Sequence, residues 1–193
     1  IIGQNNSTTN ILSLVKQGAG TWLLSGNNTY TGVTSITGGT LKAGHAAALG
    51  TTAGNTVINS GTFDFNGIAL NGESFTLAGG KLSNTGADQI NALNGQVTVT
   101  ADSRFGGTAR WDFRMPGASL LVNTGITLTK QDANRVACAA RPVTNDGSIR
   151  IDDGIFALHQ AANHGGSGIY QVNPGGELQL GSYGTSGLIL PNE

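Results

Sequence analysis

Short stretches of alternating apolar and polar residues recur along the chain, and glycine, asparagine or serine separates them. A period of two residues is typical of a β-strand with one buried face. No window of about a dozen residues has the i, i+3, i+4, i+7 spacing of an amphipathic helix without an internal glycine, and the best candidate, 45–49, is one turn long. We therefore expect an all-β protein. The alternating stretches are 40–43, 62–65, 74–78, 96–100, 119–122, 125–129, 148–151 and 177–180.

Several of these stretches begin directly after a glycine-led turn. The first three such glycines, Gly39, Gly61 and Gly80, lie about 20 residues apart, and Gly147 and Gly176 have the same place in later stretches. A unit of this length, made of short strands and turns, is typical of a solenoid whose turns bury their apolar faces against their neighbours. The pattern predicts a parallel β-helix of about eight or nine rungs. An ordinary β-sandwich is the competing fold.

Composition and charge narrow the function. The chain has 31 glycines and 4 prolines in 193 residues, and its 10 basic and 11 acidic residues leave a net charge of -1. Such a balance argues against a nucleic-acid partner and against an anionic membrane surface. No segment approaches the roughly 20 apolar residues of a membrane helix, so we expect no direct membrane insertion. A single cysteine allows neither an internal disulfide nor a multi-cysteine zinc site.

One stretch carries a motif that goes beyond composition. Residues 14–44 read LVKQGAGTWLLSGNNTYTGVTSITGGTLKAG, and this passage resembles the passenger-associated transport repeat of bacterial autotransporters. The match is long and its spacing is specific, although it covers a small part of the chain. The residues that carry it are Leu14, Lys16, Gly18, Gly20, Leu24, Ser25, Gly26, Asn28, Tyr30, Gly32, Thr34, Ile36, Gly39, Thr40 and Leu41.

The resemblance implies a right-handed β-helical passenger on the bacterial cell surface or secreted. Such a passenger crosses the periplasm and is exported through an outer-membrane β-barrel at the C-terminal end of the same polypeptide, which we expect to lie outside this chain. Residues 1–10 lack an initiator methionine and the pattern of a signal peptide, so we expect a fragment. In the family, the repeat is associated with folding and export, and we assign this role to the motif residues together with Trp22. We expect Trp22 and Tyr30 to fill or cap the interior of a rung rather than to stack on a sugar.

The segment 102–153 differs from its surroundings, because it contains all six arginines, six aspartates and Trp111. We expect it to be irregular, with a loop or subdomain protruding near 130–145. Arg104, Arg110, Trp111 and Arg114 form a candidate interaction patch, since arginine and aromatic residues are enriched in binding hot spots. The alternative is that charges of mixed sign simply solvate the surface. Cys138, flanked by alanines, is expected to be a small buried residue.

Few residues have the spacing of a catalytic or metal site. His159 and His164 follow Asp152 and Asp153, but the spacing of five positions from one histidine to the other does not fit a helical metal pair, and we expect no metal or cofactor. Acidic pairs for glycoside hydrolysis would have to come from Asp64, Asp112, Asp132 or Asp146, and no local pattern separates these residues from turn residues.

We therefore expect a non-enzymatic passenger that supports folding and export and serves as a rigid stalk for adhesion or self-association. Host surface, glycan or another copy of the chain are the candidate partners. A β-helical polysaccharide-active enzyme or a glycan-binding passenger is the alternative. A third interpretation is a scaffold whose activity lies outside these residues.

Overall fold

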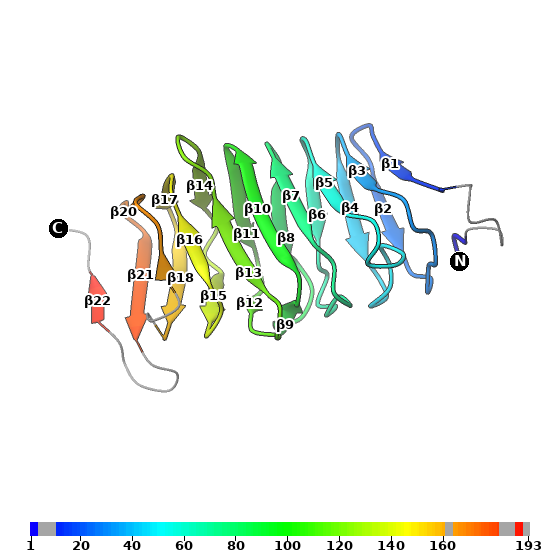
Figure 1. Cartoon of the computed structure of the whole chain (residues 1–193). Coiled ribbons are helices and arrows are strands. Elements are labelled where there is room, and N and C mark those ends of the chain that lie inside the picture. Colours follow the sequence, from blue (N-terminus) through cyan, green and yellow to red (C-terminus); the bar gives the residue numbers. More distant parts are fainter. Residues whose placement is uncertain (4–10, 161–163, 182–187, 191–193) are drawn as a thin grey trace.

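The computed structural model describes residues 1–3, 11–160, 164–181 and 188–190. Its strands form three stacked sheets, named A, B and C, which run along an elongated body (Figure 1). Neighbouring strands are parallel throughout, except that the last strand, β22, pairs antiparallel with β21. Within the described residues there is no helix. The all-β prediction and the parallel β-helix are therefore confirmed.

Each sheet takes one strand from each successive turn of the chain. Sheet A contains β1 (Leu14–Lys16), β3 (Thr34–Ile36), β5 (Thr56–Ile58), β7 (Phe75–Ala78), β10 (Gln96–Ala101), β13 (Ser119–Val122), β16 (Val143–Asn145) and β19 (His164–Gly165). Sheet B contains β2 (Thr21–Leu24), β4 (Thr40–Ala43), β6 (Thr62–Asp64), β8 (Lys81–Asn84), β11 (Ser103–Gly107), β14 (Thr127–Lys130), β17 (Ser148–Ile151) and β20 (Ile169–Val172). Sheet C contains β9 (Gln89–Leu93), β12 (Trp111–Phe113), β15 (Arg135–Ala139), β18 (Gly154–His159), β21 (Gly176–Gly181) and β22 (Leu188–Leu190).

Each rung passes from a sheet A strand to a sheet B strand and returns along a third side, and the described residues make eight such rungs. Leu14 pairs with Thr34 and Thr34 with Thr56, so one rung takes about 20 residues, as the glycine spacing predicts. All eight alternating stretches of the sequence fall on strands, at β4, β6, β7, β10, β13, β14, β17 and β21. Each of them places alternate side chains in the interior.

The third side divides the molecule into two regions. In rungs 1–3 (residues 14–74) it consists of turns, and we call this part the two-sheet region. In rungs 4–8 (residues 75–181) a sheet C strand closes each rung, and we call this part the three-sheet region. Figure 1 shows β9 and β12 beginning the third sheet about halfway along the body.

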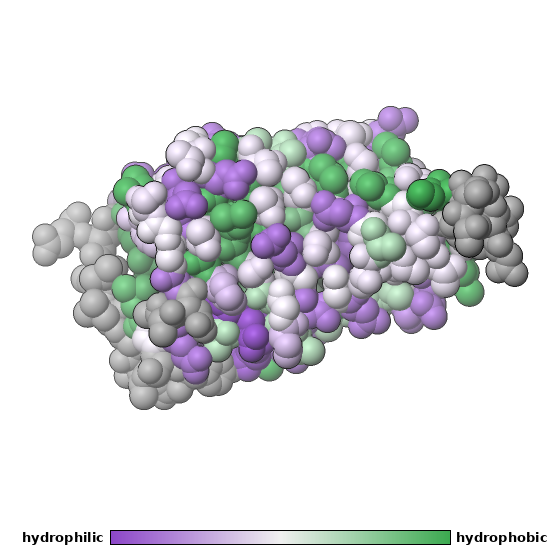
Figure 2. Space-filling model, in the orientation of Figure 1, coloured by the Kyte–Doolittle hydropathy of each residue, from purple (hydrophilic) through white to green (hydrophobic). Residues whose placement is uncertain are grey.

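Inward-facing residues of successive rungs stack in columns. One sheet B column starts at Trp22 and Leu41 and continues through Phe63, Leu82 and Phe105. Near the middle of the body this column meets Phe65 and Trp111, whose ring centroids lie 5.2 Å apart, while those of Phe105 and Trp111 lie 4.8 Å apart. Tilted and edge-on aromatic contacts of this kind add to the stabilisation from burial. On the outside, polar residues and smaller apolar areas alternate over the visible face (Figure 2).

The predicted protruding loop near 130–145 is wrong. Residues 135–139 form β15, which pairs with both β12 and β18, and tight turns join it to β14 and β16. The run VACA does not alternate because its outward-facing Ala137 is as fully buried as its inward-facing neighbours Val136 and Cys138. A parallel strand that is covered on both faces has no polar face to show in the sequence. The segment 102–153 is accordingly as regular as the rest of the solenoid.

Candidate functional site

The repeat residues 14–44 build the first rung and the first half of the second. They contribute β1, β2, the turn 25–33, β3 and β4, and rung 1 pairs with rung 2 along both sheets. Tyr30, Thr34, Ile36 and Leu41 are buried. The repeat is therefore a contact between two rungs.

A buried lysine organises the corner between β1 and β2. Lys16 is fully buried, and its Nζ donates to the carbonyl oxygens of Gln17 (3.0 Å), Gly18 (2.8 Å) and Gly38 (2.9 Å). Gly38 belongs to the next rung, so the ammonium links two consecutive corners. Charge-assisted bonds to several carbonyls are what allow a lysine to be buried.

Gly39 completes this corner and cannot carry a side chain. Its φ of +64° lies in the left-handed region, and a Cβ atom there would overlap the carbonyl oxygens of Gly18 and Gly20 and crowd Lys16 Nζ. Gly20, by contrast, has open space around a hypothetical Cβ. The two glycines of the motif therefore have different reasons to be glycine, and Gly39 is the crowded one.

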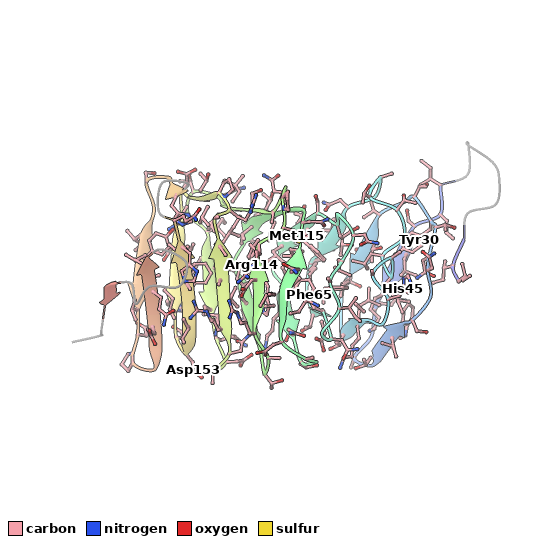
Figure 3. All side chains as sticks on the ribbon, turned by 90° about the horizontal axis from the view of Figure 1, so that it is seen from below. Tyr30, His45, Phe65, Arg114, Met115 and Asp153 are labelled. Carbon is pink, nitrogen blue, oxygen red and sulfur yellow. The ribbon has the colours of Figure 1, made fainter. Side chains whose placement is uncertain are left out.

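The third side of the two-sheet region is held by individual hydrogen bonds from side chains and from the backbone. Asn28 Nδ2 donates to the Ala48 carbonyl at 2.7 Å, and Asn28 Oδ1 accepts from the Ile2 amide at 2.7 Å. Gly32 donates its N–H to the Leu12 carbonyl, and a Cβ at Gly32 would overlap that carbonyl. Figure 3 shows Tyr30 and His45 on this side, at the end of the molecule opposite the C-terminal strands. These contacts close the third side of rungs 1 and 2, whereas strands of sheet C close that side in rungs 4–8.

A polar cluster inside the same region was not found by sequence reasoning. Tyr30 and Thr34 share a hydrogen bond of 2.7 Å between their hydroxyl oxygens, and Thr56 Oγ1 donates to Glu73 Oε1 at 2.6 Å. Thr34 and Thr56 pair in register, so the two hydrogen bonds lie in adjacent rungs. Burial raises the pKa of Glu73 to about 7 and also raises that of Tyr30. No local pattern marks Glu73, because its partner Thr56 lies 17 positions earlier in the chain.

Trp22 caps the interior column without being enclosed by it. It pairs in register with Leu41, yet it is 44% exposed, whereas Leu41 is fully buried. Lys16 Nζ lies 5.6 Å from the centroid of the Trp22 ring, within range of a cation–π contact. Trp22 is therefore half-covered, while Tyr30 fills the rung as expected.

The four residues of the candidate interaction patch do not lie together on one surface. Trp111 is fully buried and its Nε1 donates to the Gly106 carbonyl at 3.0 Å, so it belongs to the core and its assignment to a surface patch is wrong. Arg104 lies on the outer face of β11, whereas Arg110 and Arg114 flank β12 and both contact Asp112. Figure 3 shows Arg114 on the third side of the solenoid.

The remaining candidate residues have structural surroundings. Cys138 is buried, as predicted, and burial raises the pKa of its thiol. His159 Nε2 lies 3.0 Å from Arg135 Nη2, and burial together with that arginine lowers the pKa of His159. In the described ranges, no three His, Cys, Asp or Glu side chains gather as metal ligands. No helix of that part of the chain is long and apolar enough to cross a membrane.

A second buried lysine, also missed, repeats the arrangement of the first. Lys130 Nζ donates to the carbonyl oxygens of Gln131 (3.0 Å), Asp132 (2.6 Å) and Asp153 (3.0 Å), the last one rung further on. Both lysines end a strand and precede a glutamine, which is a sequence signal that could have been used. Burial lowers the pKa of Lys130 to about 8, with nearby Asp132 and Asp153 opposing the shift.

The comparisons with known proteins agree with this geometry. Residues 14–43 match the family described as the passenger-associated-transport-repeat. The chain is 33% identical over 149 residues to a protein named adhesin BmaC autotransporter, from Brucella suis biovar 1 (strain 1330). That match covers 75% of this chain and 4% of the Brucella protein, so the chain spans a small part of this relative's length. No solved structure matches the chain.

The matched repeat contains the junction of the first two rungs at Lys16 and Gly39, and the relative is itself an autotransporter. The stacked parallel sheets have the architecture that the repeat implies. The repeat match and the autotransporter relative together support an autotransporter passenger domain that carries a passenger-associated transport repeat at residues 14–43.

Proposed function

We propose that the chain supports folding and export of the passenger and forms a rigid, non-enzymatic stalk for adhesion or self-association. Its place is the bacterial cell surface or the secreted fraction. Export proceeds through a C-terminal outer-membrane β-barrel of the same polypeptide. The adhesin name of the Brucella relative supports the adhesive part of this proposal.

The observation that carries the folding role is the junction of the first two rungs. Lys16 Nζ bonds to carbonyls of both rungs, and Gly39 permits their close approach. A solenoid folds by adding rungs to an existing rung, so an early rung pair gives later rungs a template. We infer that the repeat supplies this first pair.

The non-enzymatic part of the proposal is supported by the acidic residues. Asp112 is paired with Arg110 at 2.5 Å, Asp132 with Lys81 at 2.6 Å, and Asp64 with Lys42 at 3.2 Å. Each of these carboxylates is engaged in a structural ion pair on a different rung. This arrangement favours a stabilising role over that of paired acid and base.

The test of the export role is Gly39→Val in the full-length protein, with Gly125→Val as the matched control. Gly125 occupies the same sheet A to sheet B corner with a φ of +76°, but a Cβ there would meet nothing within 4 Å. We expect slower surface exposure of the passenger for Gly39→Val, near-normal exposure for Gly125→Val, and normal barrel insertion in both. Equal exposure of the two variants would contradict a folding role for the repeat.

The test of adhesion and self-association uses the purified chain. Beads coated with it should adhere to host-cell monolayers more than beads coated with a matched amount of an unrelated β-solenoid. Sedimentation of the soluble chain over a range of concentrations measures self-association. Adhesion no greater than that of the control beads, together with a monomer at every concentration, would contradict this part of the proposal.

A further inference from the structure

An open groove runs along the corner where sheet B turns into the third side of the three-sheet region. It has a volume of about 610 Å³, which falls within the range of ligand sites, and residues of four consecutive rungs line it. Rung 4 contributes Thr85, rung 5 Thr108, rung 6 Asp132 and rung 7 Asp153. Figure 3 shows Asp153 at the edge of the solenoid. We call this feature the corner groove.

Two glycines create the groove. A Cβ at Gly106 would overlap Asp132 Oδ2, and Gly107 has a φ of +122° at which a Cβ would overlap Asn84. Because Gly106 and Gly107 of rung 5 carry no side chain, Lys81 Nζ of rung 4 and Asp132 Oδ2 of rung 6 meet above them at 2.6 Å. The depression is therefore held open by a rigid backbone and an ion pair.

The polar groups in the corner groove are fixed and mixed in kind. Burial alone would raise the pKa of Asp132, but the Lys81 ammonium and the Gly107 N–H hold that pKa below its ordinary value. Asp132 thus remains an ionised acceptor, and its side chain is 39% exposed. Thr108 and Asp153 are also exposed at the groove. A ligand would meet hydroxyls, carboxylates and one ammonium.

This lining selects among ligands. The lining has two carboxylates and one lysine, so its net charge is negative. It should therefore repel sulfated or carboxylated polymers. None of the described lining residues is aromatic, so a planar ring has no platform for stacking. Neutral sugars remain, because each hydroxyl can both donate to a carboxylate and accept from a hydroxyl or an ammonium.

We propose that the corner groove binds an uncharged oligosaccharide segment, with Thr108, Asp132 and Asp153 as its hydrogen-bonding partners. This inference deepens the proposed adhesive function and rests on it. Contacts from single sugars are weak, and the groove's length over four rungs allows several sugar units of one chain to bind together.

The experiment titrates the purified chain with neutral oligosaccharides, namely maltohexaose, cellohexaose, chitohexaose and lacto-N-tetraose, and with the anionic polymers hyaluronan and heparin. Calorimetry gives affinities, and amide chemical shifts give the site. We expect at least one neutral sugar to bind and to shift amides at 83–85, 107–109, 132–134 and 153. Binding of the anionic polymers alone, binding of no probe, or shifts confined to other residues would overturn the proposal.

Two double variants test whether sugar binding depends on the corner groove or on surface hydroxyls and carboxylates in general. Thr108→Val with Asp153→Asn removes a hydroxyl and a carboxylate from the groove. Thr98→Val with Asp102→Asn removes the same groups from outside it, and Asp102, like Asp153, accepts a backbone N–H. We expect at least tenfold weaker sugar binding for the first pair, no change for the second, and unchanged melting in both. Equal loss in the two pairs would overturn the proposal.

The bead assay distinguishes failure of the groove from failure of the adhesive function. If beads coated with the native chain adhere while no neutral sugar binds, the groove assignment is wrong and adhesion stands. If both fail, the adhesive function is wrong as well.

Discussion

The two regions of the solenoid close their third side by different means. In the two-sheet region, individual groups do this: Asn28 bonds to Ala48 and Ile2, Gly32 approaches Leu12, and Tyr30 bonds to Thr34. In the three-sheet region, backbone pairing between β9, β12, β15, β18 and β21 closes it. Backbone pairing accepts many sequences, whereas side-chain contacts require particular residues. The recognisable motif lies in the first two rungs, within the region that lacks the third sheet.

The largest expected effect lies at the centre of the molecule. Trp111→Ala removes a fully buried ring that contacts Phe65, Phe105 and Phe113, and should lower the free energy of unfolding by about 3 to 5 kcal/mol. Urea denaturation followed by circular dichroism measures it. Trp111→Phe, which leaves a smaller void, should cost less. A loss under about 1 kcal/mol would contradict the central position of this residue in the core.

Gly39→Val tests the crowded corner of the two-sheet region. We expect a cost of about 3 kcal/mol, from the left-handed backbone together with overlap with Gly18 and Gly20. Gly125→Val in the three-sheet region carries only the backbone strain and should cost about 1 kcal/mol. Thermal melting of both variants gives the comparison. Equal costs would mean that backbone conformation, not packing between rungs, makes Gly39 necessary.

Glu73 should make the stability of the two-sheet region depend on pH. Its pKa rises from 4.5 to about 7 on folding, so the folded state holds the proton more tightly. The free energy of unfolding is then highest below about pH 4.5 and falls, by about 3 kcal/mol, as the pH rises from there through 7.

Glu73→Gln keeps a neutral group that can accept from Thr56 and removes the titration. Urea midpoints between pH 4.5 and 7.5 should decline for the native chain and decline less for the variant. Parallel profiles would show that Glu73 is solvated and ionised throughout.

The smallest expected effect is that of Trp22→Ala. Trp22 occupies an interior column at its uncovered end and is 44% exposed, so truncation should cost about 1 kcal/mol. Both substitutions remove a tryptophan, so the difference between their losses in unfolding free energy measures the contribution of burial. Acrylamide quenching of the single-tryptophan variants Trp22→Phe and Trp111→Phe checks the exposures: the remaining Trp22 should quench readily and Trp111 poorly.

The sequence by itself determined the solenoid, the approximate rung length and the place of eight strands. It could do so because glycine turns and a two-residue period are local signals, and because the crowded corner at Gly39 lies within a recognisable motif. Tyr30 could be placed in the interior for the same reason. Features that depend on neighbours along the chain were therefore predictable.

The tertiary structure alone decided the third sheet, the burial of Trp111, the Glu73 cluster and the corner groove. Strand β15 shows no alternation because both its faces are covered, and this covering comes from other rungs. Thr56 and Glu73 meet, and Lys81 and Asp132 meet above Gly106, only when rungs stack in register. Residues that meet only through stacking lie 17 or more positions apart in the chain. The local alternation around each of them does not indicate its partner.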